Sequence, residues 1–179
     1  MTSLAYIGAW LFHWLIVVIP RKEDRRHILG AAGPLLRQSA GGAQAIVSAL
    51  ENAVQNAKTA DPPSADEIRQ LCASVNPQSQ GPLVLANGTY ATWMQYLAYE
   101  VAQRDRLHQK LIPAYPYLDA ELIELLWKVS EASFAKQVTQ INSITIPVAN
   151  PDLGWLAESL VAYADTCRNV NTYLDQHGK

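Results

Sequence analysis

The chain has 179 residues, of which 49% are apolar, so it is long enough for one folded domain and too apolar for wholesale disorder. It carries 14 basic and 16 acidic residues, and this balance excludes the basic surface that nucleic-acid binding requires. Its two cysteines are too few for a disulfide framework, and Cys167 lies on an apolar helical stripe, where we expect it to be a small buried hydrophobe.

The N-terminal segment from Leu4 to Ile19 reads LAYIGAWLFHWLIVVI, with no charged residue before Arg21. A helix on the surface of a soluble domain would show a polar face at a period of 3.6 residues, and this segment has none. We therefore predict a membrane anchor, although the run of about 16 residues lies at the lower edge of the ~17–25 needed to span a bilayer. The alternative is a helix buried at the centre of a soluble bundle.

Three side chains within the apolar run bear on this choice. Trp10 and Trp14 lie mid-segment and not at the interfacial positions where Trp is enriched, which weighs slightly against a span. His13 is the one strongly polar side chain, and an ionisable group inside a membrane is a functional candidate by default. No carboxylate lies near it in the sequence, so we assign it a structural hydrogen bond.

The short basic cluster that follows predicts the topology. It consists of Arg21, Lys22, Arg25 and Arg26. Lys and Arg are retained on the cytoplasmic side of a membrane, so the residues after Pro20 are expected in the cytoplasm. Because the charges follow the apolar run and do not precede it, the segment does not resemble a cleaved signal peptide. The same topology predicts that the sequon Asn87-Gly88-Thr89 is not glycosylated.

Five amphipathic or capped segments predict helices after residue 42. Apolar residues recur at steps of three and four from Ala43 to Ala57. Ser64-Ala65-Asp66-Glu67 has the capping-box pattern and predicts a helix through about Ser74 that buries Ile68, Leu71 and Cys72. Thr89 can cap a helix over residues 90–111, and Asp119 can cap one long helix to about Asn142. The last helix has the cleanest period, through Leu153, Leu156, Leu160, Tyr163, Cys167, Val170 and Leu174.

No convincing strand pattern is present. Residues 76–88 contain two Pro and two Gly and indicate a loop that tucks against the bundle, and residues 144–146 are the only β-like fragment. The fold class predicted is therefore all-α: a bundle of about four to five helices, preceded by the apolar N-terminal helix. We divide the chain into an anchor (1–20), a basic and small-residue linker that leads to a helix start (21–42), and the bundle domain (43–179).

Motifs for catalysis, phosphate binding and metal binding are missing from the sequence. The nearest approach to a helical metal motif is Asp105-Arg106-Leu107-His108, which we interpret as a solvated helix end. We therefore predict no cofactor and no metal. A helical enzyme with a composite site is the remaining enzymatic hypothesis, and it would need Glu100, Asp105 or His108 to converge in a pocket.

The aromatic residues between positions 90 and 117 are candidates for a partner surface. Tyr and Trp are enriched where proteins bind one another. Core packing accounts for Trp93, whereas the candidates for the partner surface are Tyr90, Tyr99, Tyr115 and Tyr117. The leading functional hypothesis is a membrane-anchored, non-enzymatic module that binds another protein. The alternative is a soluble bundle, with the first helix as its core, that binds a small apolar ligand between helices.

Overall fold

The computed structural model describes residues 30, 32–54, 60, 62–143 and 150–177. The predicted anchor from Leu4 to Ile19, the basic cluster and the β-like fragment at 144–146 lie outside the described residues. Among the helices that are described, none combines the length and the apolar character needed to cross a bilayer.

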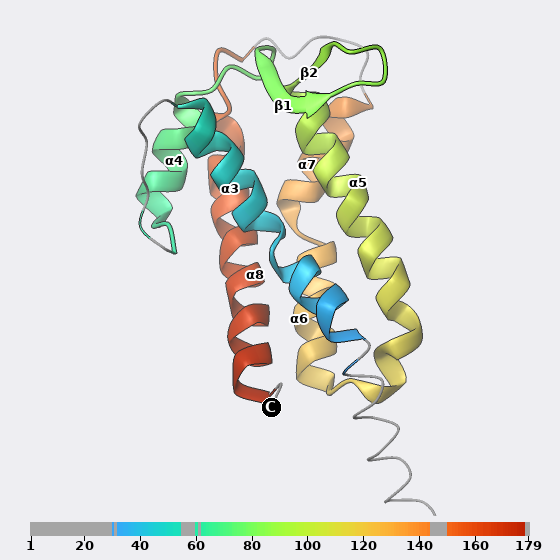
Figure 1. Cartoon of the computed structure of the whole chain (residues 1–179). Coiled ribbons are helices and arrows are strands. Elements are labelled where there is room, and N and C mark those ends of the chain that lie inside the picture. The colour runs from blue at the N-terminus through green and yellow to red at the C-terminus, as the bar shows by residue number, and fades with distance from the viewer. Residues whose placement is uncertain (1–29, 31, 55–59, 61, 144–149, 178–179) are drawn as a thin grey trace, which may run out of the picture.

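The described chain is mostly helical, as the sequence predicted (Figure 1). A helical stretch over residues 32–40 leads through Gly41 into the first of the labelled helices. The α-helices are α3 (Gly42–Ala53), α4 (Ala65–Ala73), α5 (Trp93–Leu111), α6 (Ala120–Ser130), α7 (Ser133–Asn142) and α8 (Ala157–His177). Short 3-10 helices, η2 (Ile112–Tyr117) and η3 (Gly154–Leu156), precede α6 and α8, and a hairpin of β1 (Gln80–Val84) and β2 (Tyr90–Thr92) precedes α5.

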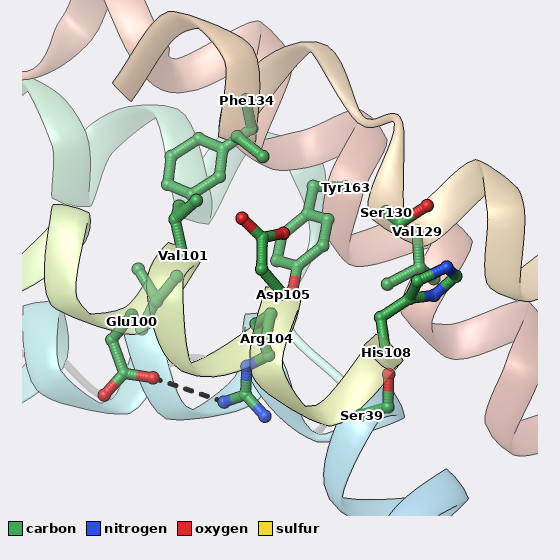
Figure 2. Close-up of a pocket in the computed structure, with 12 residues that line it drawn as sticks. Ser39, Glu100, Val101, Arg104, Asp105, His108, Val129, Ser130, Phe134 and Tyr163 are labelled. Atoms are coloured by element: carbon green, nitrogen blue, oxygen red, sulfur yellow. Dashed lines mark hydrogen bonds and ion pairs between the residues drawn. The ribbon is translucent and has the colours of Figure 1, made fainter. Parts of the chain in front are cut away.

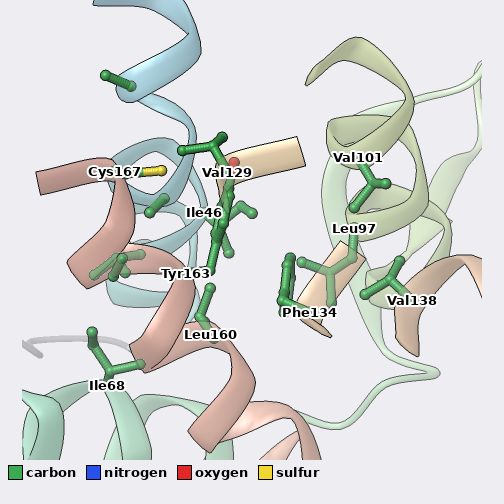
Figure 3. Packing of buried hydrophobic residues seen from close by; sticks show 14 of the residues in the cluster. Ile46, Ile68, Leu97, Val101, Val129, Phe134, Val138, Leu160, Tyr163 and Cys167 are labelled. Carbon is green, nitrogen blue, oxygen red and sulfur yellow. The ribbon is translucent and has the colours of Figure 1, made fainter. Parts of the chain in front are cut away.

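Helix α8 is the centre of the bundle and packs against α3, α4, α6 and α7. Its apolar seam was predicted from the steps of three and four, and every member of the predicted seam is buried, which confirms the prediction. In the core shown in Figure 3, the ring of Tyr163 on α8 stacks on Phe134 of α7, with centroids 5.5 Å apart and an interplanar angle of 14°. Helix α8 thus has apolar partners along its length.

The capping box at Ser64 is confirmed as the start of α4. The Ser64 hydroxyl oxygen accepts a hydrogen bond from the Glu67 amide at 3.3 Å, and the Ser64 amide donates to the Glu67 carboxylate at 2.7 Å. The Ser64 contact also holds the pKa of Glu67 below its usual value. As predicted, Ile68, Leu71 and Cys72 are buried.

The prediction of a loop without strands at 76–88 was wrong, because β1 lies within this segment and pairs with β2 in an antiparallel hairpin. The chain turns between Leu85 and Thr89, where the Leu85 amide donates to the Thr89 carbonyl at 2.8 Å. Gly88 has φ 79°, a left-handed conformation that glycine adopts at little cost. Ala91 of β2 is buried, and both strands contact α5.

The start of α5 also differs from the prediction. Thr92, and not Thr89, is the N-cap: its hydroxyl oxygen accepts from the Gln95 amide at 3.3 Å, while its amide donates to the Gln95 side-chain oxygen at 2.9 Å. Thr89 belongs to the hairpin turn, where its hydroxyl donates to Asn87 at 2.7 Å. On the inner face of α5, Trp93, Met94, Leu97, Val101 and Leu107 are buried.

The single long helix predicted from Asp119 to Asn142 is two helices, because the chain breaks between α6 and α7 at residues 131–132. The apolar positions of the sequence explain the break. Val129 and Phe134 are both buried but five residues apart, and one continuous helix cannot place that step on one face. The break lets Phe134 reach Tyr163 and carries α7 against α5 and α8.

Candidate functional site

A polar cluster lies where the C-terminal half of α5 faces the stretch 32–40, the junction of α6 with α7, and α8 (Figure 2). It encloses a small cavity whose walls combine charged and polar groups with aromatic and aliphatic side chains. The lining residues that carry chemistry are Ser39, Glu100, Arg104, Asp105, His108, Ser130 and Tyr163. Four segments that are distant in the sequence therefore meet at one site.

Arg104 ties two of these segments together. It forms an ion pair with Glu100 at 3.3 Å, and the two side chains are only 16% and 15% exposed. Its Nη1 also donates to the backbone carbonyl of Gln38 at 2.5 Å, and its buried Nε has no hydrogen-bond partner among the described residues. Although its i,i+4 spacing is typical of weak surface pairs, the pair is partly buried, and Arg104 links the stretch 32–40 to α5.

Gly42 permits this close approach. A Cβ atom at this position would collide with Arg104 Nε and would lie 2.5 Å from the Tyr163 hydroxyl. A side chain at this position would therefore displace Arg104 and the Tyr163 hydroxyl from where they lie.

The interpretation of Asp105 to His108 as a solvated helix end was wrong for His108, whereas Asp105 is exposed. Its imidazole is half-buried, with the Tyr115 hydroxyl 3.2 Å from both ring nitrogens and the Trp127 ring edge-on at 5.4 Å. Burial lowers the pKa of His108, against the opposing charges of Asp105 and Glu131. The imidazole is therefore held neutral to a lower pH than an exposed histidine.

Asp105 lies on the same helix, three residues before His108. Its side chain stands at the exposed rim of the cavity, and partial burial raises its pKa, while the nearby His108 lowers it. The pKa of Asp105 is thus raised and that of His108 is lowered. Each of these shifts favours the neutral form of the group.

The two cysteines and Tyr163 are buried, and burial disfavours their ionised forms. Burial raises the pKa of Cys72 to about 12 and also raises that of Cys167. Burial raises the pKa of Tyr163 still more strongly. The prediction that Cys167 is a small buried hydrophobe is confirmed, since it is 2% exposed.

The chemistry open to the cluster is limited by its size. Glu100, Asp105 and His108 do converge, as a composite enzymatic site would require. However, the cavity has a free volume of about 20 Å³, which accommodates about one water molecule. In this arrangement the imidazole and the carboxylates can exchange protons with water but cannot enclose a substrate. No group of three potential metal ligands occurs in the part of the chain that the structure describes.

A larger groove lies on the other side of Arg104, between residues 38–45 and α5. Its free volume is about 480 Å³, and its walls are Gln38, Gly41, Ala45, Tyr99, Glu100, Gln103, Arg104 and Leu107. A second groove of about 320 Å³ runs between α3 and α8 beside Pro62 and Pro63. Both are open to solvent and lined mainly by uncharged side chains, and those of the second groove are mostly small.

The four tyrosines predicted as a partner surface lie in three places. Tyr90 is in β2 and 56% exposed, and Tyr99 is on α5, 42% exposed, at the wall of the larger groove. Tyr115 and Tyr117 lie together on η2, where Tyr115 is half-buried against His108 and Tyr117 is 39% exposed. The fold therefore does not bring all four together.

The predicted anchor residues Trp10, His13, Trp14, Arg21, Lys22, Arg25 and Arg26 lie outside the described residues. Comparisons with protein-family models, with curated proteins and with solved structures find no match to this chain.

Proposed function

We propose that the chain is a single-pass membrane-anchored helical module that binds a protein partner and has no catalytic role of its own. The run from Leu4 to Ile19 is the anchor, and the basic cluster after Pro20 keeps the folded part in the cytoplasm. The larger groove beside Tyr99 is the partner site.

The packing of α8 is the observation that carries this proposal. In the soluble alternative, the apolar N-terminal run is the core and lies on the α8 seam. That seam already contacts α3, α4, α6 and α7. Because four helices occupy the surface that the apolar run would need, burial within the bundle is the less favourable location for it, and hydrocarbon is the more favourable one.

The grooves support a binding role over a catalytic one. The polar cluster has room for about one water molecule, whereas the groove at Tyr99 has a free volume of about 480 Å³. A solvent-open groove of this kind suits an apolar or hydrogen-bonding side chain of a partner, and an exposed tyrosine at its wall is a typical anchor of protein interfaces.

Membrane fractionation of the full-length chain tests the proposal. We expect the protein to stay in the membrane pellet through high salt and alkaline carbonate, and detergent to release it. Replacing Leu11 and Leu15 by lysine should move it to the soluble fraction or to aggregates, because each charge at the centre of a span costs about 2.5–3.5 kcal/mol. Replacing the same two residues by isoleucine is the matched control and should leave the distribution unchanged. Recovery of the wild-type chain as a soluble monomer would overturn the proposal.

A further inference from the structure

The described chain begins at one end of the bundle, together with η2. Helix α5 runs the full length of the molecule, with the hairpin directly before it and η2 directly after it (Figure 1). Gln38 lies beside Arg104, and Arg37 pairs with Asp175 near the C-terminus of α8 at 3.0 Å. The stretch 32–40 therefore starts near the C-terminal ends of α5 and α8. We call this the proximal end, and it comprises residues 30 and 32–34, η2 and the last turn of α8.

The proximal end exposes an uncharged apolar segment. None of the six residues of η2, Ile-Pro-Ala-Tyr-Pro-Tyr, carries a charge, and none is buried. Ile112 is 49% exposed and Tyr117 39% exposed. The segment is rigid for its length because it contains two prolines, so its apolar side chains are presented at low entropic cost.

The chain length before the described residues limits how far this end can lie from the predicted anchor. Nine residues separate Pro20 from Gly30, and a fully extended chain of that length spans at most about 30–35 Å. Four of those residues are Arg or Lys and two are Asp or Glu, so the segment keeps an excess of positive charge, and an anionic membrane surface attracts each basic residue by about 1 kcal/mol.

We propose that η2 rests in the interfacial layer of the same bilayer that holds the N-terminal anchor. This inference rests on the proposed function, because it needs the anchor. Tyr and other amphipathic rings favour the headgroup region, and an apolar segment without charges can enter it. The result is a fixed orientation, with η2 against the lipid and the hairpin pointing away.

The hairpin is a second exposed apolar segment with which η2 can be compared. It also exposes apolar side chains, with Val84 55% and Tyr90 56% exposed. It lies beyond the opposite end of α5, whose 19 residues place it about 28 Å from η2. Exposed apolar character alone would therefore favour either end. The position of Gly30, the first described residue, distinguishes them, because the nine residues before it reach the hairpin end only when they are almost fully extended, whereas a flexible chain of that length typically spans about 15–18 Å.

Lipid quenching in the full-length protein tests the inference. The protein is reconstituted into vesicles of phosphatidylcholine and phosphatidylglycerol that contain brominated lipid. An NBD fluorophore is attached through I112C, or through V84C as the matched control, while Cys72 and Cys167 stay unlabelled because each is buried. We expect the loss of NBD emission to be at least about twofold larger at position 112, because interfacial segments lie ~5–10 Å into the headgroup boundary.

Two further double variants test whether η2 itself contacts the lipid or only lies near it. With the fluorophore at exposed Gln109, replacing Ile112 and Tyr117 by serine should abolish the quenching, whereas replacing Val84 and Tyr90 by serine should not. If the protein floats with the vesicles but positions 112 and 84 are quenched equally, this inference is wrong and the anchor stands. If the protein does not float with the vesicles, the proposed function fails and this inference fails with it.

Discussion

Arg104 on α5 is structurally important because it links that helix to the stretch 32–40. On its own helix it is one member of an i,i+4 pair, a type of interaction that contributes a few tenths of a kcal/mol at an exposed site. In the folded chain it is 16% exposed, pairs with an equally buried Glu100 and reaches the Gln38 carbonyl 66 residues earlier. Removing its charge would leave the Glu100 carboxylate and a backbone carbonyl without this donor.

We predict that Arg104→Met lowers the free energy of unfolding by about 1–3 kcal/mol, the usual cost of leaving partly buried polar groups without their partner. Methionine retains much of the apolar stem, so the loss reports mainly on the hydrogen bonds and the charge. Urea denaturation followed by circular dichroism of the detergent-solubilised chain measures it.

Lys128→Met is the matched control for this prediction. Lys128 forms the same i,i+4 pair with Glu124 at 2.7 Å, but the two side chains are 59% and 67% exposed. Its loss should cost less than about 0.5 kcal/mol. Equal effects of the two substitutions would show that the burial of Arg104 contributes nothing.

His108 gives the chain a pH-dependent contribution to stability. Burial lowers its pKa in the folded state, so between the folded and unfolded pKa values the unfolded chain binds more protons. The free energy of unfolding should therefore fall as the pH drops below the ordinary histidine value of about 6.5. Asp105, whose pKa is raised, acts with the opposite sign and only near pH ~4.

We predict that wild-type protein loses stability relative to His108→Gln between about pH 7 and pH 5, by less than about 1 kcal/mol because the imidazole is only half-buried. Urea midpoints at the two pH values give the difference, and NMR titration of the His108 ring gives the pKa directly. An NMR pKa at or above that of an exposed histidine would contradict the burial argument.

Among the elements, the hairpin depends on a single backbone conformation. Gly88 closes the turn with φ 79°, and no other atom lies within 4 Å of where its Cβ would be. The cost of a side chain there is therefore conformational and not steric. We predict that Gly88→Ala destabilises the protein by about 1–2 kcal/mol, the cost of a left-handed L-residue.

Gly88→Asn is the control at the same position, because asparagine tolerates the left-handed region better than alanine does. It should cost clearly less than alanine in the same urea denaturation experiment. If both substitutions are neutral, the hairpin does not unfold together with the bundle.

Some elements of the fold are encoded by a pattern within one short segment of the sequence, and others are not. The start of α4 and the seam of α8 were predictable because a capping box and a 3.6-residue period each lie within one segment. The hairpin was not, because strands of five and three residues with Gly81 and Pro82 inside β1 carry too little strand signal. The break at residues 131–132 left a trace, the five-residue step from Val129 to Phe134, which a search for long periodic helices passes over.

The polar cluster could not be predicted for a different reason. The cavity beside His108 is also lined by Ser39, Ser130 and Tyr163. Nothing in the local sequence of α5 indicates that these distant segments meet there. The spacing of Asp105 and His108 was visible, but their burial depends on packing among four elements. Local patterns therefore predicted helices well and predicted the composite site poorly.

At the scale of the whole molecule, the two ends of the bundle have different surroundings in the proposed orientation. The proximal end has η2 and the start of the described chain, whereas the opposite end has the hairpin with an exposed Asn87. The sequon Asn87-Gly88-Thr89 therefore lies in an exposed turn, far from the proposed membrane contact, and can report the side of the membrane on which the bundle lies.

We predict that the full-length chain, translated in the presence of endoplasmic-reticulum microsomes, inserts but remains unglycosylated at Asn87, because Arg21, Lys22, Arg25 and Arg26 keep the bundle on the cytosolic side. Electrophoresis before and after endoglycosidase treatment measures the modification.

Replacing residues 1–20 by a cleavable secretory signal should give the glycosylated band and prove that the turn is a competent acceptor. Changing the four basic residues to glutamine while introducing lysine at Thr2 and Ser3 should glycosylate a fraction of the chains, since the charge bias is then reversed. Glycosylation of the wild-type chain would place the bundle on the opposite side and reject the topology while keeping the anchor.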